Sequence, residues 1–210
     1  LQIIGSEIAS HPDELLTALI GINCGTIARV SLSEASHHSS HPSTGSSVAG
    51  LVAANHGLLD ACKVSGNIQG LWSQTGGLAA YNYASGRIVD CRFVAAVEST
   101  IGSKNGDVVG GLCAVNEGVI QFGGVAGTIR ISNGRAGRAS IGGVVGRNEV
   151  NGAVLNPYGA CLIEVAPLSL KSVGGIVGHN RGFVGAAKWA VVVECGESET
   201  VGQIIGFQSV

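Results

Sequence analysis

Short apolar runs recur along this chain, and each ends on an asparagine. All but the first open on a glycine, and the asparagines lie 32, 27, 34, 32 and 32 residues apart. The six runs align without gaps over residues 18–23, 50–55, 77–82, 111–116, 143–148 and 175–180, and a truncated copy covers 201–207. A self-similar unit of this length is typical of solenoids and other stacked repeats.

Polar and apolar residues alternate in the rest of each unit. A glycine follows each asparagine, and an apolar residue comes two positions after that glycine, as in Gly118 and Ile120. The last part of the unit alternates again, as in residues 63–68 and 124–129. Period-2 alternation in short runs, punctuated by glycine and asparagine, predicts strands joined by tight turns. We expect two or three short strands in each unit.

A unit with so few strands buries its apolar face only by stacking on its neighbours. Coils would then lie ~4.8 Å apart with like residues on like, and parallel crossovers are right-handed. The sequence therefore predicts an all-β fold, a right-handed parallel β-helix of about six coils. The repeated asparagines would form an internal ladder at one corner, because a buried amide needs partners above and below. They are Asn23, Asn55, Asn82, Asn116, Asn148 and Asn180.

Residues 1–17 precede the first repeat and are interpreted as an N-terminal cap or lead-in, with the solenoid over residues 18–210. Residues 10–17, with Pro12 near the start, have the pattern of a short helix that would cap the stack. Residues 201–210 end in mid-repeat with almost no charge. Because open strand edges pair with other chains, we expect self-association or flanking domains at the coil ends.

Composition narrows the class of protein. Glycine contributes 34 of 210 residues, hydrophobic residues 45% and charged residues 12%, which is the opposite of a disordered chain. A net charge of −2 offers no basic field for nucleic acid or an anionic membrane. No apolar run reaches the ~18 residues of a membrane span. We expect neither a nucleic-acid partner nor a membrane-spanning segment.

The repeat resembles the GLUG repeat of bacterial surface proteins. The most similar copies are residues 142–148, 174–180 and 57–62, and the resemblance extends over about residues 18–207. It implies a secreted or cell-surface β-helical module, usually without catalytic residues of its own. Such modules occur in adhesins and beside immunoglobulin-A-cleaving zinc peptidases, so a host surface or a glycan is an expected partner. The first unit departs from the pattern because Ala18 replaces glycine.

The six cysteines have no metal-binding or redox spacing. Cys62 and Cys91 share one repeat position and are predicted to pack as small core groups; a disulfide between their coils stays an alternative, strained by parallel stacking. Cys113 aligns with valines of other units and is also assigned to the core. The better candidates for exposure or pairing are Cys24, Cys161 and Cys195.

His37, His38 and His41 form the one histidine cluster, and three imidazoles can bind a metal. Their segment, residues 33–47, is rich in Ser and Pro and lies between repeats, so we interpret it as a solvated surface loop. The motif His-Glu-x-x-His is absent from the sequence. We expect no metal site and no cofactor.

Glu117 and Glu149 are the one ordered pair of carboxylates, since both directly follow a ladder asparagine in adjacent units. Like charges ~5 Å apart can raise one pKa and create an acid/base pair. Asp60 and Asp90 are one position out of register and should not stack. We interpret Glu117 and Glu149 as solvated corner residues and favour a non-catalytic scaffold, adhesin segment or fibre-forming module. The alternatives are a polysaccharide-active β-helix enzyme and an auxiliary domain of a surface metallopeptidase.

Overall fold

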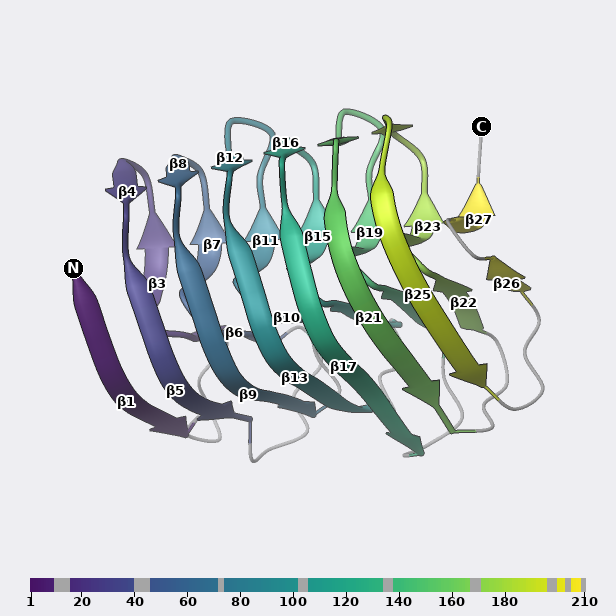
Figure 1. Cartoon of the computed structure of the whole chain (residues 1–210), viewed down its shortest axis with the longest axis horizontal. Coiled ribbons are helices and arrows are strands. Elements are labelled where there is room, and N and C mark those ends of the chain that lie inside the picture. Colours follow the sequence, from purple (N-terminus) through teal and green to yellow (C-terminus); the bar gives the residue numbers. More distant parts are fainter. Residues whose placement is uncertain are drawn as a thin grey trace.

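The computed structural model describes residues 1–9, 16–39, 46–71, 74–101, 106–133, 138–166, 171–195, 200–202 and 205–208. Over these residues every regular element is a β-strand, and neighbouring strands pair in parallel. The chain winds as a right-handed solenoid from one end of the long axis to the other (Figure 1). The predicted right-handed parallel β-helix is confirmed. The described residues contain no helix that could cross a membrane.

Each of the first six coils has four strands, one more than expected, and three further strands, β25 to β27, follow within the described residues. The strands stack into four sheets. Sheet A holds the long strands β1 (Gln2–Ala9), β5 (Ser31–His38), β9 (Lys63–Leu71), β13 (Arg92–Ile101), β17 (Gly124–Asn133), β21 (Tyr158–Val165) and β25 (Lys188–Cys195). Sheet B holds β2 (Leu16–Thr17), β6 (Ser47–Ala49), β10 (Gln74–Gly76), β14 (Asp107–Gly110), β18 (Ala139–Gly142), β22 (Lys171–Gly174) and β26 (Thr200–Gly202).

The repeated sequence signature forms the other two sheets. Sheet C holds β3 (Ile20–Asn23), β7 (Val52–Asn55), β11 (Ala79–Asn82), β15 (Cys113–Asn116), β19 (Val145–Asn148), β23 (Val177–Asn180) and β27 (Ile205–Gln208). Sheet D holds β4 (Thr26–Ala28), β8 (Leu58–Asp60), β12 (Arg87–Val89), β16 (Val119–Gln121), β20 (Ala153–Leu155) and β24 (Phe183–Val184).

The solenoid starts earlier than predicted. Strand β1 pairs with β5 from Gln2↔Ser31 to Ala9↔His38, so it is a regular member of sheet A and not a lead-in. Of the predicted cap helix, Leu16–Thr17 is strand β2, and residues 10–15 lie outside the described residues. The repeat signature did not identify β1, because the signature lies in sheets C and D, whereas a coil begins with its sheet A strand.

The core is a set of columns of aliphatic side chains that run along the solenoid axis. One column of leucine, valine and isoleucine is fully buried in the interior coils: Leu51, Leu78, Leu112, Val144 and Ile176. Burying one such side chain contributes about 1.5–3 kcal/mol. The columns repeat from coil to coil, so the whole stack shares one continuous core.

Two corners of the cross-section depend on special backbone positions. Between sheets D and A, one residue in each of the first five coils adopts a left-handed conformation with φ of 49–55°: Arg29, Ala61, Asp90, Phe122 and Asn156. Between sheets B and C the chain doubles back sharply; a Cβ added to Gly142 would lie 1.9 Å from the carbonyl oxygen of Val145. Glycine at this corner therefore lets the outer faces of sheets B and C approach each other.

Candidate functional site

The six repeat asparagines stand in one buried column at the end of sheet C and are at most 6% exposed. Nδ2 of each asparagine from Asn23 to Asn148 donates to Oδ1 of the asparagine in the next coil, at 2.8 Å in all five pairs. Each Nδ2 also donates to the carbonyl of the glycine that follows in its own coil. This ladder holds the coils in register and positions the residues on either side of it.

The glycine after each asparagine is required by the close approach of neighbouring coils. A Cβ added to Gly118 would lie 2.1 Å from the carbonyl oxygen of Gly86 and 2.4 Å from that of Tyr83. Gly25 occupies the same position in the first coil, and a Cβ there would meet nothing within 4 Å. For Gly118 the requirement therefore comes from the preceding coil. A Cβ on Gly86 or Gly152, four residues after the ladder asparagine, would also lie 2.3 or 2.2 Å from Oδ1 of the asparagine in its own coil.

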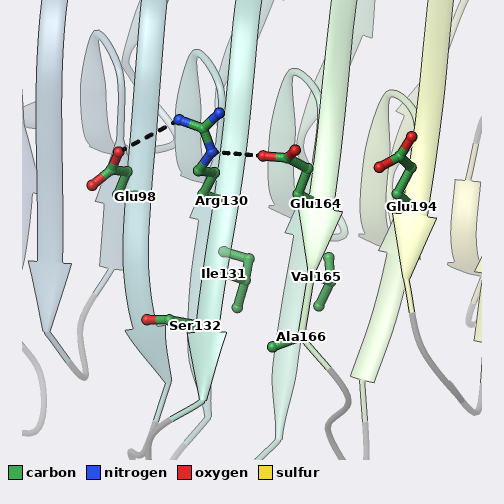
Figure 2. A pocket seen from close by; sticks show the side chains of 8 residues that line it. All are labelled: Glu98, Arg130, Ile131, Ser132, Glu164, Val165, Ala166 and Glu194. Carbon is green, nitrogen blue, oxygen red and sulfur yellow. Dashed lines mark hydrogen bonds and ion pairs between the residues drawn. The ribbon is translucent and has the colours of Figure 1, made fainter.

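The outer face of sheet A carries a row of charged side chains from successive strands (Figure 2). Glu98, Arg130, Glu164 and Glu194 are in register. Arg130 Nε lies 2.6 Å from Glu164 Oε2, and its Nη1 lies 3.9 Å from Glu98 Oε1. More than half of the Arg130 side chain is exposed, and exposed pairs contribute at most about 1 kcal/mol. This row is an acidic surface rather than an enclosed site.

The outer face of sheet C carries a different set of side chains in two columns. The residues before the ladder asparagines are Ile22, Ala54, Tyr81, Val115, Arg147 and His179. The residues after them are Cys24, His56, Tyr83, Glu117, Glu149 and Arg181. Aromatic and charged groups thus gather over the coils that contain β7 to β23.

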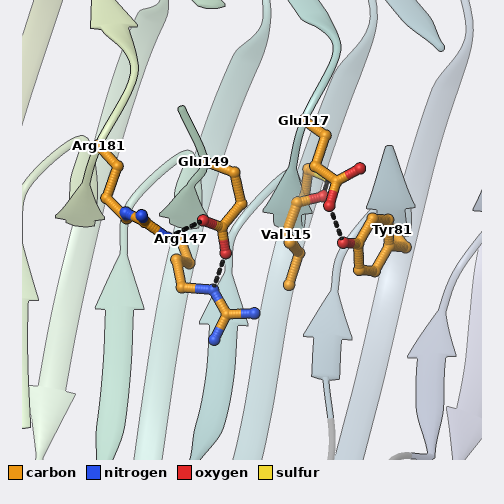
Figure 3. Close-up of polar contacts among 7 residues, drawn as sticks. Tyr81, Val115, Glu117, Arg147, Glu149 and Arg181 are labelled. Carbon is orange, nitrogen blue, oxygen red and sulfur yellow. Dashed lines mark hydrogen bonds and ion pairs between the residues drawn. The ribbon is translucent and has the colours of Figure 1, made fainter. Parts of the chain in front are cut away.

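Three rings stack along this face. The centroid of Tyr83 lies 4.0 Å from that of His56 and 4.2 Å from that of Tyr81, with interplanar angles of 10° and 27°. The Tyr81 hydroxyl donates to the Glu117 carboxylate (Figure 3). Burial, and then this hydrogen bond, raise the pKa of Tyr81 above its ordinary value. The stack is therefore anchored to the next coil through a neutral phenol.

Glu149 joins guanidinium groups of two coils. Its Oε1 lies 2.6 Å from Arg147 Nε, and its Oε2 lies 3.2 Å from Arg181 Nη1 (Figure 3). Only 18% of the Glu149 side chain is exposed, against 48% for Arg181. Burial, and then the charge of Arg147, lower the pKa of His179 beside this cluster. The carboxylate holds both guanidinium groups in fixed positions.

The sequence-predicted carboxylate pair lies in one column, but its two members contact different groups. Glu117 accepts from a tyrosine, whereas Glu149 is shared between two arginines. Asp60 is paired with Val89, so Asp90 is one position out of register with it.

A groove of about 270 Å³ runs where the outer faces of sheets B and C meet. Its titratable lining consists of Asp107, Arg138, Arg147, Glu149, His179 and Arg181. Guanidinium groups outnumber carboxylates there by three to two. A second apolar cluster of Val108, Ala114 and Val115, with Tyr81 packed against it, lies next to the groove. The groove is thus concave, partly apolar and lined by guanidinium groups, and it is the candidate binding site.

The structure corrects the interpretation of residues 33–47 as a solvated loop. Residues 31–38 form β5, and His37 is fully buried with Nδ1 2.9 Å from the Ala49 carbonyl oxygen and Nε2 2.7 Å from Ser6 Oγ. His38 is half-buried, and His41 lies outside the described residues. Alternation could have found this, because His37 stacks on Ile8 and Ile68. Among the residues described, no three metal-ligating side chains converge.

The cysteines divide between core and surface. Cys62, Cys91 and Cys113 are at most 1% exposed, and Cys24 is exposed. Cys161 is buried in the main core cluster, contrary to the prediction. Burial raises its pKa to about 12. The side chain of Cys195 lies outside the described residues.

Comparisons with known proteins add no relative: no family model matches the chain, nor does any curated protein or solved structure. The class of the protein is therefore defined by its fold, a parallel β-solenoid with an internal asparagine ladder.

Proposed function

We propose that this chain is a non-catalytic module of a secreted or cell-surface protein, of the GLUG-repeat type. In this proposal it is an adhesin or stalk segment that binds an acidic glycan in the groove between sheets B and C. The observation that carries the proposal is the groove itself, where Arg138, Arg147 and Arg181 lie together beside a row of stacked rings. Guanidinium groups bind carboxylates in a bidentate manner, and aromatic rings provide apolar surface with polar edges for sugars.

The arginines of the groove keep donors for a ligand. A guanidinium has five N–H donors, and the ion pairs of Arg147 and Arg181 with Glu149 each use one nitrogen. Because Glu149 orients both groups in advance, a ligand would not have to order them, which lowers the cost of binding. The acidic row on sheet A has one guanidinium among three carboxylates and would repel the same ligand.

Binding to a panel of acidic and neutral oligosaccharides, measured by calorimetry at low salt, tests this function. We expect acidic glycans to bind and the affinity to fall as salt is raised. The double variant Arg147→Ala/Arg181→Ala should lose at least tenfold in affinity, since each charge-assisted hydrogen bond contributes about 1.5–3 kcal/mol. Arg130→Ala, on the opposite face, is the matched control. Equal binding by both variants, or preference for neutral glycans, would overturn the proposal.

A polysaccharide-active enzyme is the second candidate, and the outward column of Glu117 and Glu149 beside the groove is the observation that favours it. If wild-type protein cleaves a glycan from the panel and Glu149→Gln does not, this candidate replaces the first. A wild type that binds glycans without cleaving any of them supports the non-catalytic module.

The first coil supports the stalk part of the proposal. Leu19, Ile20 and Ile27 are only half-buried, whereas Val52 and Leu59, which pair with two of them in the next coil, are fully buried. A further coil, from a flanking segment or a second copy, would cover them. Sedimentation velocity over a range of concentrations and negative-stain microscopy test the second copy: a monomer at all concentrations with no filaments leaves only the flanking segment.

A further inference from the structure

Two buried cysteines stand next to each other in the column that follows the corner between sheets D and A. Cys62 and Cys91 are 1% and 0% exposed. The residues around them are in register, since Asp60 pairs with Val89 and Lys63 with Arg92. Neighbouring parallel strands lie about 4.8 Å apart, which is within the Cα separation of about 4.4–6.8 Å that disulfides span.

The two cysteines also contact each other directly. The Cys62 backbone N–H donates to Cys91 Sγ, with the nitrogen 3.3 Å from the sulfur. In the same column, the neighbours beyond the pair are Val30 and Gly123, so neither cysteine has another partner there. The other buried cysteines lie elsewhere, Cys113 in sheet C and Cys161 in sheet A.

We propose that Cys62 and Cys91 form a disulfide that joins the second coil to the third when the chain folds in the presence of a disulfide oxidant. The pair is a modification site independent of the glycan groove. The disulfide proposal depends on the proposed function in one respect: an extracellular location would supply the oxidant, because disulfides persist in oxidising compartments.

The sulfur environment favours this exchange. The hydrogen bond with the Cys91 thiol lowers the pKa of Cys62, and the same contact together with burial raises the pKa of Cys91. As the two coils come together, this contact favours Cys62 as the thiol that loses its proton, and the thiolate is the nucleophilic form. Strain from parallel stacking opposes the bond, but the contact of the Cys62 amide with Cys91 Sγ already brings the two residues together.

The reaction is a thiol–disulfide exchange with oxidised glutathione. The Cys62 thiolate attacks one glutathione sulfur, forms a mixed disulfide and releases one glutathione thiolate. Cys91 then loses its proton and attacks the Cys62 sulfur, which forms the protein disulfide and releases the second glutathione thiolate. Two protein thiols are oxidised and one glutathione disulfide is reduced. Since both sulfurs are buried, the exchange takes place while the coils assemble.

The disulfide would close a loop of 29 residues (91 − 62), which is one whole coil. A closed loop restricts the unfolded chain and so stabilises the folded one. The remaining strain reduces this gain, and the melting temperature reports the balance of the two effects.

Refolding of the full chain in glutathione redox buffer, and separately in dithiothreitol, tests the proposal. After alkylation and non-reducing digestion, mass spectrometry should find the peptides of Cys62 and Cys91 joined. The oxidised protein should melt roughly 5–15 °C higher than the reduced one, and added reductant should abolish the difference. Folded, reduced protein exposed to the same buffer should oxidise far more slowly than refolding protein.

The double variant Cys62→Val/Cys91→Ala carries residues that this column holds in other coils, so it should fold and melt at one temperature in both buffers. Cys113→Ala, another core cysteine, should keep the disulfide. Two alkylated thiols at positions 62 and 91 after refolding in redox buffer would overturn the proposal, as would a bond to another cysteine. Glycan binding by the reduced protein is a separate readout, so either proposal can fail without the other.

Discussion

The ladder column and the two outward columns beside it are one residue apart, yet they differ in character along the whole solenoid. The ladder position is asparagine in six coils, whereas the position after it is Cys, His, Tyr, Glu, Glu and Arg. Inside, each asparagine meets the asparagine of the next coil, so every coil imposes the same requirement. Outside, side chains meet solvent and one another. In this fold, the positions that repeat in every coil are therefore those that hold the coils together. The positions that vary from coil to coil are on the surface, where a ligand can bind.

The largest predicted effect is on the glycine that lets adjacent ladder corners approach. Gly118→Ala should destabilise the protein by about 3 kcal/mol or prevent folding, because its Cβ meets backbone oxygens that cannot move aside. Gly25→Ala, at the same position with open space around it, should change stability by less than about 1 kcal/mol. Urea unfolding of both variants measures the difference, and equal effects would mean that the turn, not the neighbouring coil, requires glycine.

The second largest loss of stability is expected for substitutions of the ladder asparagines. Asn116→Ala removes the acceptor of Asn82 and the donor to Asn148, so two buried amides lose a partner, at about 1–3 kcal/mol each. Asn23→Ala should cost about half as much, since Asn23 is bonded to one ladder neighbour. Glu117→Gln, one residue from Asn116 on the outer face, should cost less than about 0.5 kcal/mol. If Glu117→Gln proves as damaging as Asn116→Ala, the contrast between inside and outside is wrong.

The buried side chain of His37 should make the stability of the folded protein depend on pH. Burial lowers the pKa of His37, so the folded state favours neutral imidazole. Stability should be complete above the unfolded pKa of about 6.5 and fall as pH drops below it, by at most about 1.4 kcal/mol per pH unit. His37→Ile, which matches its column neighbours, should remove most of this loss between pH 7.5 and 5.5. The more exposed His179 has a pKa shifted in the same direction, and His179→Gln should remove less.

The smallest effect should come from the acidic row on sheet A. Arg130→Ala breaks two exposed ion pairs and should cost less than about 1 kcal/mol. Raising the salt concentration should reduce that cost further, because exposed charges are screened. A larger loss that persists in salt would show that this face also holds the coils together.

Much of this fold was predictable from sequence, because stacking makes every coil repeat the same requirement. The spacing of the asparagines predicted the register, and the alignment of Cys113 with valine predicted its burial. The start of the first coil was missed because the repeat signature of sheets C and D does not extend to β1. Cys161 was misplaced because the two preceding coils hold Gly127 and Ala95 at this position, and such small residues do not indicate a core position. The groove could not be predicted, since it depends on how sharply the chain turns at Gly142 between sheets B and C.

The ladder bonds all run the same way, from the amide nitrogen of one coil to the amide oxygen of the next. The two ends of the solenoid therefore differ in the direction of their side-chain hydrogen bonds, in addition to the direction of the chain. At its leading end, Oδ1 of Asn23 accepts from the backbone N–H of Gly25 and not from a ladder amide, so a coil added there extends the ladder only by offering an amide N–H. Two copies that met leading end to leading end would bring oxygen against oxygen. Growth by stacking, from whatever source the next coil comes, is consequently restricted to a head-to-tail order.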